Sequence, residues 1–318
     1  MWCGLVRPID VLNVGLLCAD VPVLLPGDEV DFSRDSILIE KLRVVSGGDA
    51  ANAAVNLARL GVRSALSSIV GDDVFGRGIL HMIGQSGVMT DYIKVVPGVD
   101  TSVSVVLVKN SGERLFLYSN SSTEKVSIDD ITADAFPLAR HVNYGSLFGM
   151  TKLDQDADSV LRLAKEAGCT TSLDITGAAE IIKFENAEST LRYVDYFIPS
   201  YREANLLTGE TSPPRMADFL IRNTGAGCII IKLGEEGCFV KTADIERSIP
   251  AFKADVVDGT GAGDSFVGGF LAGLINGWDV GRCARFANGV AGFNTQFAGA
   301  TTKHMSMKSV IEFMGDNL

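Results

Sequence analysis

A glycine-rich segment that ends in an aspartate is the part of the sequence best suited to chemistry. It reads Asp258-Gly-Thr-Gly-Ala-Gly-Asp264, follows a strand-like run from 256, and precedes an apolar helical pattern. Glycines let the backbone approach a ligand closely, and a helix N-terminus presents unpaired N–H groups with partial positive charge. We therefore predict that the N–H groups of Gly261, Ala262 and Gly263 stabilise a phosphoryl group while Asp264 accepts a hydroxyl proton.

Two other glycine-rich motifs fit this segment less well. A dinucleotide-binding fingerprint would place its third glycine where Asp264 stands, and would have an acidic ribose partner about 20 residues later. A Walker-type loop would need Gly-Lys followed by Ser or Thr, and the sequence has no such triplet here. The segment also lies at the end of the predicted strand–helix series. These differences favour phosphoryl transfer over dinucleotide binding.

A second glycine-rich segment, Ser46-Gly-Gly-Asp-Ala-Ala-Asn52, opens another predicted helix, and Asp20 follows the first predicted strand. A carboxylate accepts hydrogen bonds from two hydroxyls, and an amide both donates and accepts. Asn52 alone is more often a capping or helix-surface residue. Together, Asp20 and Asn52 suit a polyhydroxy ligand.

The elements that must position these residues follow an alternating pattern. Short β-rich runs alternate with helical patterns, which is typical of parallel strands joined by crossover helices. The sequence therefore predicts one α/β unit over residues 1–318, with a doubly wound, mainly parallel sheet flanked by helices. We expect strands at 9–15, 64–70, 171–174, 196–199 and 228–232, and helices at 50–60, 156–167 and 202–208.

Two regions, 21–45 and 101–118, break this rhythm because neither has a crossover helix beside it. Ser102-Val-Ser-Val-Val-Leu-Val108 and Arg114-Leu-Phe-Leu-Tyr118 flank Asn110-Ser-Gly112 like the strands of a hairpin. We expect a small inserted β-sheet lid from about 18–45 and 97–120, with the two pieces adjacent in space. The alternative is that both regions are edge strands of the main sheet.

Composition narrows the class of partner. With 47% hydrophobic residues the chain can bury a large core, and its formal charge of −11 argues against a nucleic-acid binder. The six cysteines include no C-x-x-C pair, the N-terminus lacks a secretory pattern, and no apolar stretch is long enough for a membrane span. We expect a reduced, cytoplasmic protein that acts on a small molecule.

Several segments together resemble the ribokinase-like, or PfkB, carbohydrate kinases. Gly47-Gly-Asp-Ala-Ala-Asn52 with Leu57-Ala-Arg-Leu-Gly61 is similar to the N-terminal signature of that family, and Val70-Gly-Asp-Asp-Val-Phe-Gly76 is similar to its continuation. The segment from 258 to 264 resembles the C-terminal signature. The resemblance spans essentially the whole chain, and it implies an α/β domain, a β-lid, and phosphorylation of a sugar or polyol by ATP.

The resemblance also implies roles for individual residues. Substrate contacts would come from Asp20, Gly48 and Asn52, with Asp49 beside the sugar and Asp264 as the base. ATP contacts would come from Lys232, Gly234, Gly237, Thr260, Gly261, Gly263 and Asn288. Mg²⁺ would be held through water near Glu203 and Ser200, and a monovalent cation such as K⁺ near Asp258 and Thr260.

Three positions depart from the family pattern. Ser200 stands where the family usually has Asn, and Gly259 where a Thr is common. Asp49 stands where ribokinases proper tend to have Lys, and no acidic partner is evident near 144–148. A negative charge beside the sugar disfavours an anionic substrate. We therefore expect a neutral sugar or polyol rather than a 2-keto-3-deoxy sugar acid or ribose.

Two other functions stay open from the sequence. A nucleoside kinase of the adenosine type would use an aromatic shelf on the lid, which Phe116 and Tyr118 could supply. A sugar-binding protein without turnover would be consistent with Ser200, although the intact loop before Asp264 argues against it. Because an exposed β-lid has an unpaired edge and an apolar face, we also expect a homodimer formed through the lid.

Overall fold

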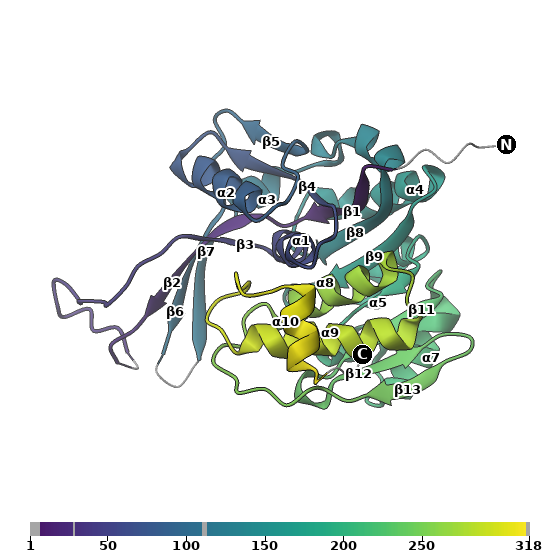
Figure 1. Cartoon of the computed structure of the whole chain (residues 1–318). Helices are drawn as coiled ribbons and strands as arrows, with labels where there is room; N and C mark the ends of the chain where they lie inside the picture. The colour runs from purple at the N-terminus through teal and green to yellow at the C-terminus, as the bar shows by residue number, and fades with distance from the viewer. Residues whose placement is uncertain (1–6, 28, 110–112, 316–318) are drawn as a thin grey trace.

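The computed structural model describes residues 7–27, 29–109 and 113–315, and within these ranges the strands form sheets of nine and four strands (Figure 1). In the larger, central sheet all neighbouring strands pair in parallel except in the two pairs that involve residues 238–241. This confirms the predicted mainly parallel α/β fold. In spatial order its strands are β13 (Glu246–Ile249), β12 (Cys238–Lys241), β11 (Cys228–Lys232), β10 (Tyr196–Phe197), β9 (Thr170–Ile175), β8 (Ala139–Leu147), β1 (Ile9–Gly15), β4 (Ser64–Gly71) and β5 (Ile93–Val96).

Helices cover both faces of the central sheet. One face packs against α1 (Asp49–Arg59), α8 (Ala262–Ile275), α9 (Val280–Thr295) and α10 (Met307–Phe313). The other face packs against α4 (Ala157–Glu166), α5 (Phe184–Leu191), α6 (Tyr201–Thr208) and α7 (Pro213–Asn223). The remaining helices are α2 (Val74–Gln85), α3 (Ser121–Lys125), and the 3₁₀ turns η1 (Ile128–Asp130), η2 (Ala133–Leu138), η3 (Leu153–Asp156) and η4 (Gly234–Glu236).

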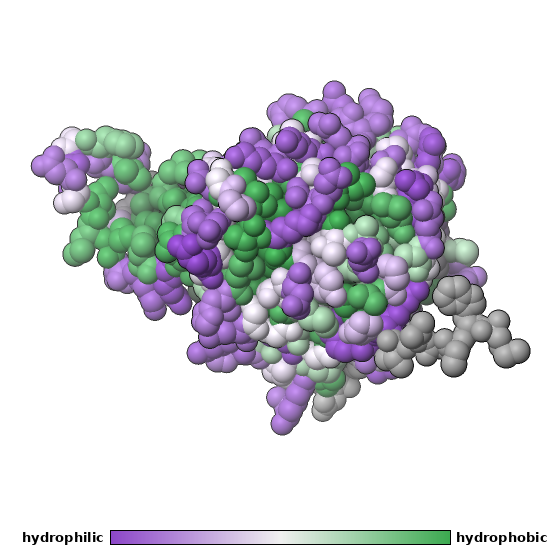
Figure 2. Space-filling model, turned by 90° about the horizontal axis from the view of Figure 1, so that it is seen from above, coloured by the Kyte–Doolittle hydropathy of each residue, from purple (hydrophilic) through white to green (hydrophobic). Residues whose placement is uncertain are grey.

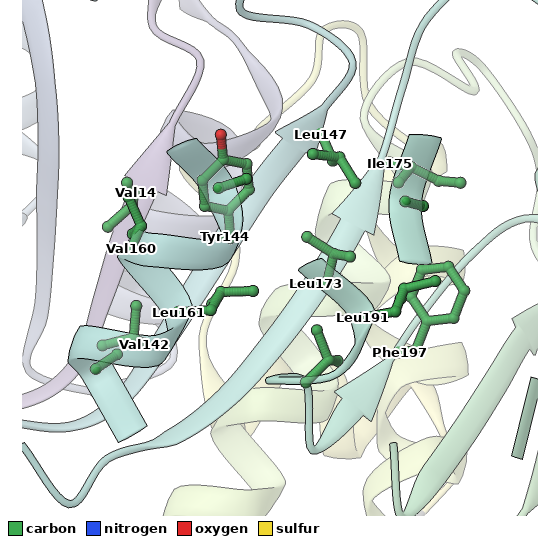
Figure 3. Packing of buried hydrophobic residues seen from close by; sticks show 14 of the residues in the cluster. Val14, Val142, Tyr144, Leu147, Val160, Leu161, Leu173, Ile175, Leu191 and Phe197 are labelled. Carbon is green, nitrogen blue, oxygen red and sulfur yellow. The ribbon is translucent and has the colours of Figure 1, made fainter. Parts of the chain in front are cut away.

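Burial on both faces explains why the central strands are mostly apolar, without a regular alternation of apolar and polar residues. All seven residues of β1 are buried, and Figure 3 shows Val14, Val142 and Leu173 of adjacent strands packing beneath Val160 and Leu161 of α4. A parallel strand covered by helices on both sides needs a continuous hydrophobic run rather than an alternating one. The core therefore fixes the strands whose carboxyl ends carry the functional side chains.

The small sheet has the order β3 (Val45–Gly47), β2 (Cys18–Leu24), β6 (Val103–Val108), β7 (Arg114–Ser119), and stands to one side of the central sheet (Figure 1). β6 and β7 pair antiparallel, as the hairpin pattern predicts, and the two separated regions do lie side by side. The predicted turn at Asn110-Ser-Gly112 lies outside the described residues.

Part of the lid region is not a strand, and one strand expectation is wrong. Residues 29–44 contain no strand, so the first region contributes only β2 and β3 to the small sheet. The strand-like run before the glycine-rich segment is also not a strand: Val256 and Val257 are 67% and 68% exposed. The N–H groups of Val257 and Asp258 instead donate to the carbonyl of Thr295 at the end of α9.

The structure also describes the state of the cysteines and the character of the helices. In the described part of the chain, Cys18, Cys169, Cys228, Cys238 and Cys283 are free thiols, and Cys3 lies outside it. No helix among the same residues has the length and apolar character that crossing a membrane requires.

Candidate active site

The glycine-rich loop forms the N-terminus of α8, as predicted. Gly261 caps the helix in the left-handed conformation, with a φ of 69°. A Cβ atom on Gly261 would lie 2.3 Å from the carbonyl oxygen of Ala300, so the neighbouring chain as well as the backbone angle requires glycine here. Asp264 lies in the first turn of the helix, close to the unpaired N–H groups.

The carboxylate of Asp264 is held from α1. Asn52 Nδ2 donates a hydrogen bond of 2.8 Å to Asp264 Oδ2, and one turn further along Asn56 donates to the hydroxyl of Ser265 at 3.0 Å. These bonds cross the contact between α1 and α8, so helix packing joins the two signature segments. Burial and the negative charge of Asp49 raise the pKa of Asp264 well above its ordinary value. A carboxyl with a raised pKa is a stronger proton acceptor.

A cavity of about 1380 Å³ opens in front of Asp264. Its wall carries every predicted substrate-binding residue: Asp20, Gly48, Asp49 and Asn52. It also carries Asp154, whose carboxylate accepts from the hydroxyl of Tyr144 at 2.9 Å and which sequence reasoning missed. We call it the sugar-side cavity, because the residues predicted to bind substrate line it. Its described lining includes four aspartates and no Lys, Arg or His.

The glycine pair before α1 makes room for Asp20. A Cβ on Gly47 would lie 2.1 Å from Asp20 Oδ2, and one on Gly48 would lie 2.3 Å from the carbonyl oxygen of Leu16. Gly48 also has a φ of 98°, which favours glycine. Burial raises the pKa of Asp20 to about 6, and the charge of Asp49 contributes.

Asp49 is held in place by the carboxyl end of β8. The hydroxyl of Ser146 donates to Asp49 Oδ2 at 3.1 Å, and Ser146 has a left-handed φ of 83° that is uncommon for a residue other than glycine. Sequence reasoning did not identify Ser146, because nothing local predicts a contact between residues 97 positions apart.

A second cavity, of about 600 Å³, lies on the other side of the glycine-rich loop. The predicted ATP-side residues Lys232, Gly234, Gly237, Gly263 and Asn288 line it, whereas Thr260 and Gly261 line the sugar-side cavity. Ala262 and Gly263 line both cavities. The loop that begins α8 therefore separates two spaces and presents its N–H groups between them.

The amide of Asn288 donates to the carbonyls of Ile249 and Pro250, so its nitrogen also fixes the end of β13.

Lys232 brings a buried positive charge to this loop. Its Nζ atom donates to both carboxylate oxygens of Asp174 at 2.8 Å, and a Cβ on Gly263 would lie 3.5 Å from it. Although burial opposes it, the carboxylates of Asp174 and Glu203 raise the pKa of Lys232, which stays charged. Asp174 was not predicted. Its place at the carboxyl end of β9 is the signal that could have identified it, because ligands of open α/β sheets bind at that edge.

Comparisons with known proteins agree with this geometry. Residues 11–306 match the family described as "pfkB family carbohydrate kinase". The chain belongs to the pfkB family. It is 30% identical over 234 residues to a fructokinase of Solanum tuberosum, an alignment that covers 72% of each protein.

Solved structures give the same fold. A putative ribokinase II of E. coli, in complex with ATP and Mg²⁺, has a TM-score of 0.84 and 23% identity, covering 97% of this chain and all of the other. An adenosine kinase of Sinorhizobium meliloti has a TM-score of 0.81 and 23% identity, covering 96% and 99%. As a pfkB family member, the chain is a carbohydrate kinase that phosphorylates a sugar at the expense of ATP.

The departures from the pfkB pattern have defined places in the structure. Ser200 caps α6: its hydroxyl accepts from the N–H of Glu203, and its own N–H donates to Glu203 Oε2 at 2.6 Å. Glu203 Oε1 makes no hydrogen bond within the described residues. No group of three or more His, Cys, Asp or Glu side chains among the described residues could hold a metal ion directly.

The predicted monovalent-cation residues lie together, but with an unexpected neighbour. Asp258 Oδ1 accepts from both the N–H and the hydroxyl of Thr260, and Oδ2 accepts from the N–H of Gly299. Arg114 of β7 adds an ion pair of 2.5 Å to Oδ1. Sequence reasoning missed Arg114 because its partner is 144 residues away.

Proposed function

We propose that this kinase phosphorylates a hydroxyl of a neutral sugar or polyol, with Asp264 as the general base. The observation that carries the proposal is the position of the Asp264 carboxylate, at the N-terminus of α8 and in the wall of the sugar-side cavity, 2.8 Å from Asn52 Nδ2. A hydroxyl in that cavity would have a base beside it and the N–H groups of the loop beyond it.

Four carboxylates support a neutral substrate. A sugar acid in the sugar-side cavity would meet Asp20, Asp49, Asp154 and Asp264 and no basic side chain of the described lining. Hydroxyl groups, in contrast, can donate to those oxygens. The Oδ1 atom of Asn52 is buried without a hydrogen-bond partner, and a substrate hydroxyl would satisfy it.

The chemical step follows from the same residues. Asp264 takes the hydroxyl proton as the oxygen attacks the γ-phosphorus of ATP, and the bond to the ADP oxygen breaks. The N–H groups of Gly261, Ala262 and Gly263, with the ammonium of Lys232, stabilise the charge on the transferred group. Glu203 and Ser200 would hold Mg²⁺ through water, and the metal would supply further positive charge to the phosphates.

A nucleoside is the second candidate substrate. Phe116 and Tyr118 both line the sugar-side cavity, so they could stack against a base. The similar proteins named fructokinase and ribokinase favour a sugar over a nucleoside.

The test is release of ADP in the presence of Mg²⁺ across neutral sugars, polyols, sugar acids and nucleosides. We expect a neutral sugar or polyol to give the highest kcat/KM, and Asp264→Asn to lower kcat by at least about 100-fold while ATP still binds. Asp91→Asn, at an exposed position, is the matched control. A sugar acid that exceeds every neutral compound would refute the substrate class, and a variant within about threefold of wild type would refute the base.

We further propose that any K⁺ requirement is weak, because the guanidinium of Arg114 already places a positive charge beside Asp258. We also propose a homodimer formed through the small sheet. The dimer is supported by exposed apolar side chains on β7, Leu115 and Leu117, and on the loop between β2 and β3, Phe32, Leu38 and Leu42.

A further inference from the structure

A third cavity, of about 600 Å³, has a charge opposite to that of the sugar-side cavity. It lies between the C-terminal ends of α1 and α2 and the segment 297–304. Its described lining residues include four basic side chains and no Asp or Glu: Arg43, Arg59, Lys303 and His304. In a chain of formal charge −11, a cavity whose ionisable lining residues are all basic is unexpected.

Arg59 is the central residue of this basic cavity. Its Nη1 atom is buried and has no hydrogen-bond partner, and no carboxylate of the described residues forms an ion pair with it. Burial lowers the pKa of its guanidinium, and no neighbouring charge opposes the shift. Leaving a buried cationic donor unpaired is costly, so such groups are normally paired. Arg63, four residues later, shows the usual case: its guanidinium pairs with Asp10 at 2.7 Å.

A purely structural role does not account for Arg59. It ends α1, where a basic side chain interacts favourably with the helix dipole. That interaction needs no open space beyond the guanidinium and does not satisfy Nη1. The cavity also contains the hydroxyls of Ser46 and Thr301, which can donate to an oxyanion.

We propose that the basic cavity binds a small phosphate-bearing anion, either inorganic phosphate or a phosphate monoester. A volume of about 600 Å³ accommodates a ligand of metabolite size. Guanidinium groups pair with phosphate oxygens in a two-pronged geometry, and Arg43 and Arg59 approach the cavity from different segments.

The site is linked to catalysis by the segment 297–304. Ala300 of this segment lines both the basic cavity and the sugar-side cavity, and its carbonyl oxygen lies against Gly261. The N–H of Gly299 donates to Asp258, at the start of the loop. An anion that holds the segment also holds the wall against which the loop rests.

The test is titration of the protein with inorganic phosphate and, separately, glycerol phosphate, followed by calorimetry and thermal unfolding. A saturating non-hydrolysable ATP analogue with Mg²⁺ blocks the catalytic loop during both titrations. Arg59→Met keeps the length of the side chain, Lys303→Gln changes an exposed residue, and Lys152→Gln is a control outside the cavity. Chloride at equal ionic strength controls for screening.

We expect either ligand to raise the Tm of wild type and Lys152→Gln by about 3 °C or more. Arg59→Met should lose at least about 10-fold in affinity, and Lys303→Gln about 3-fold, as expected when charged phosphate contacts are removed. Without the anion, Arg59→Met should melt no lower than wild type, since its unpaired charge is gone. A response to the ester alone would identify an ester as the ligand.

Equal affinity in wild type and Arg59→Met, or no binding of either ligand to wild type, would overturn the proposal. So would a loss of Tm in Arg59→Met that is the same with and without phosphate, because that would mark Arg59 as structural. If Arg59→Met does not fold, the same comparison is made with Lys303→Gln, and unchanged affinity in that variant counts against the site.

Discussion

At the residue scale, the carboxylate proposed as the general base lies in surroundings that disfavour its ionised form. Asp264 is half-buried; its desolvation and the charges of Asp49 and Asp174 raise its pKa, while the hydrogen bond from Asn52 offsets only part of this effect. Ionised Asp264 therefore costs folding free energy at neutral pH. The arrangement makes Asp264 a good base and a poor contributor to stability.

A stability measurement can detect this cost. Because the folded-state pKa of Asp264 is raised, its contribution to stability is greatest at low pH and is lost as pH rises through that pKa. Asp264→Asn removes the ionisation and keeps an oxygen to accept from Asn52. We expect the difference in Tm between this variant and wild type to be smallest near pH 4 and to rise by about 2 °C or more in favour of the variant by pH 8, measured with EDTA and without nucleotide.

Asp91→Asn, which removes an exposed carboxylate, should show no such dependence on pH. An Asp264→Asn variant that melts below wild type at pH 8 would contradict the account.

The sequence predicted the residues that carry motifs, but not the ones that support them. Asp20, Asn52 and Asp264 meet in one cavity as expected, because glycine-rich segments and strand ends have local signatures. Asp174 and Ser146 have none. Their roles depend on contacts with Lys232 and Asp49 that only the assembled sheet creates.

At the element scale, the ion pair between β7 and the glycine-rich loop joins the small sheet to the catalytic centre. Arg114 and Asp258 have side chains that are 26% and 21% exposed, so solvent screens the pair only in part. Because β7 also contributes Phe116 and Tyr118 to the sugar-side cavity, the pair fixes one wall of that cavity.

Arg114→Met tests this connection. We expect KM for the sugar to rise about 3- to 10-fold and kcat to change less than twofold, since about 1 kcal/mol of positioning is lost and the base is untouched. The difference from wild type should shrink at high salt, which screens the wild-type pair.

Arg77→Met is the matched control, because its ion pair with Asp72 is exposed and distant from the cavity. An equal fall in kcat and kcat/KM for Arg114→Met would instead assign Arg114 to the chemical step.

Element prediction succeeded where burial imposes a pattern and failed where it does not. Residues 9–15 and 228–232 were predicted to the residue, because strands buried on both faces are mostly apolar and do not alternate with polar residues. Val256 and Val257 are also β-branched, but they belong to no strand. The carbonyl of Thr295 at the end of α9 instead accepts from the N–H groups of Val257 and Asp258. β-branched residues alone do not specify a strand.

At the scale of the whole molecule, the small sheet stands out from the body and carries an uncovered apolar surface. Figure 2 shows hydrophobic residues gathered on this protruding part. Leu115 and Leu117 are 59% and 53% exposed, on the face of β7 opposite to Phe116 and Tyr118. β7 is also an edge strand, with backbone groups free to pair.

Leu117→Glu should therefore weaken the proposed homodimer. We expect wild type to elute with the mass of two chains in light scattering, and the variant to shift toward one chain at micromolar concentration, because a charge would be buried at the interface. Val74→Glu, at a position on α2 that is 71% exposed, should leave the mass unchanged. A wild type that is monomeric at all concentrations would refute the dimer.

The four aspartates of the sugar-side cavity also bear on how the reaction ends. A neutral sugar enters without electrostatic opposition, but once it carries a phosphoryl group it brings about two negative charges to a wall that is already negative. The same surface that accepts the substrate thus repels the product. For the proposed neutral substrate, transfer of the phosphoryl group would therefore reverse the electrostatic preference of the cavity and favour departure of the phosphorylated product.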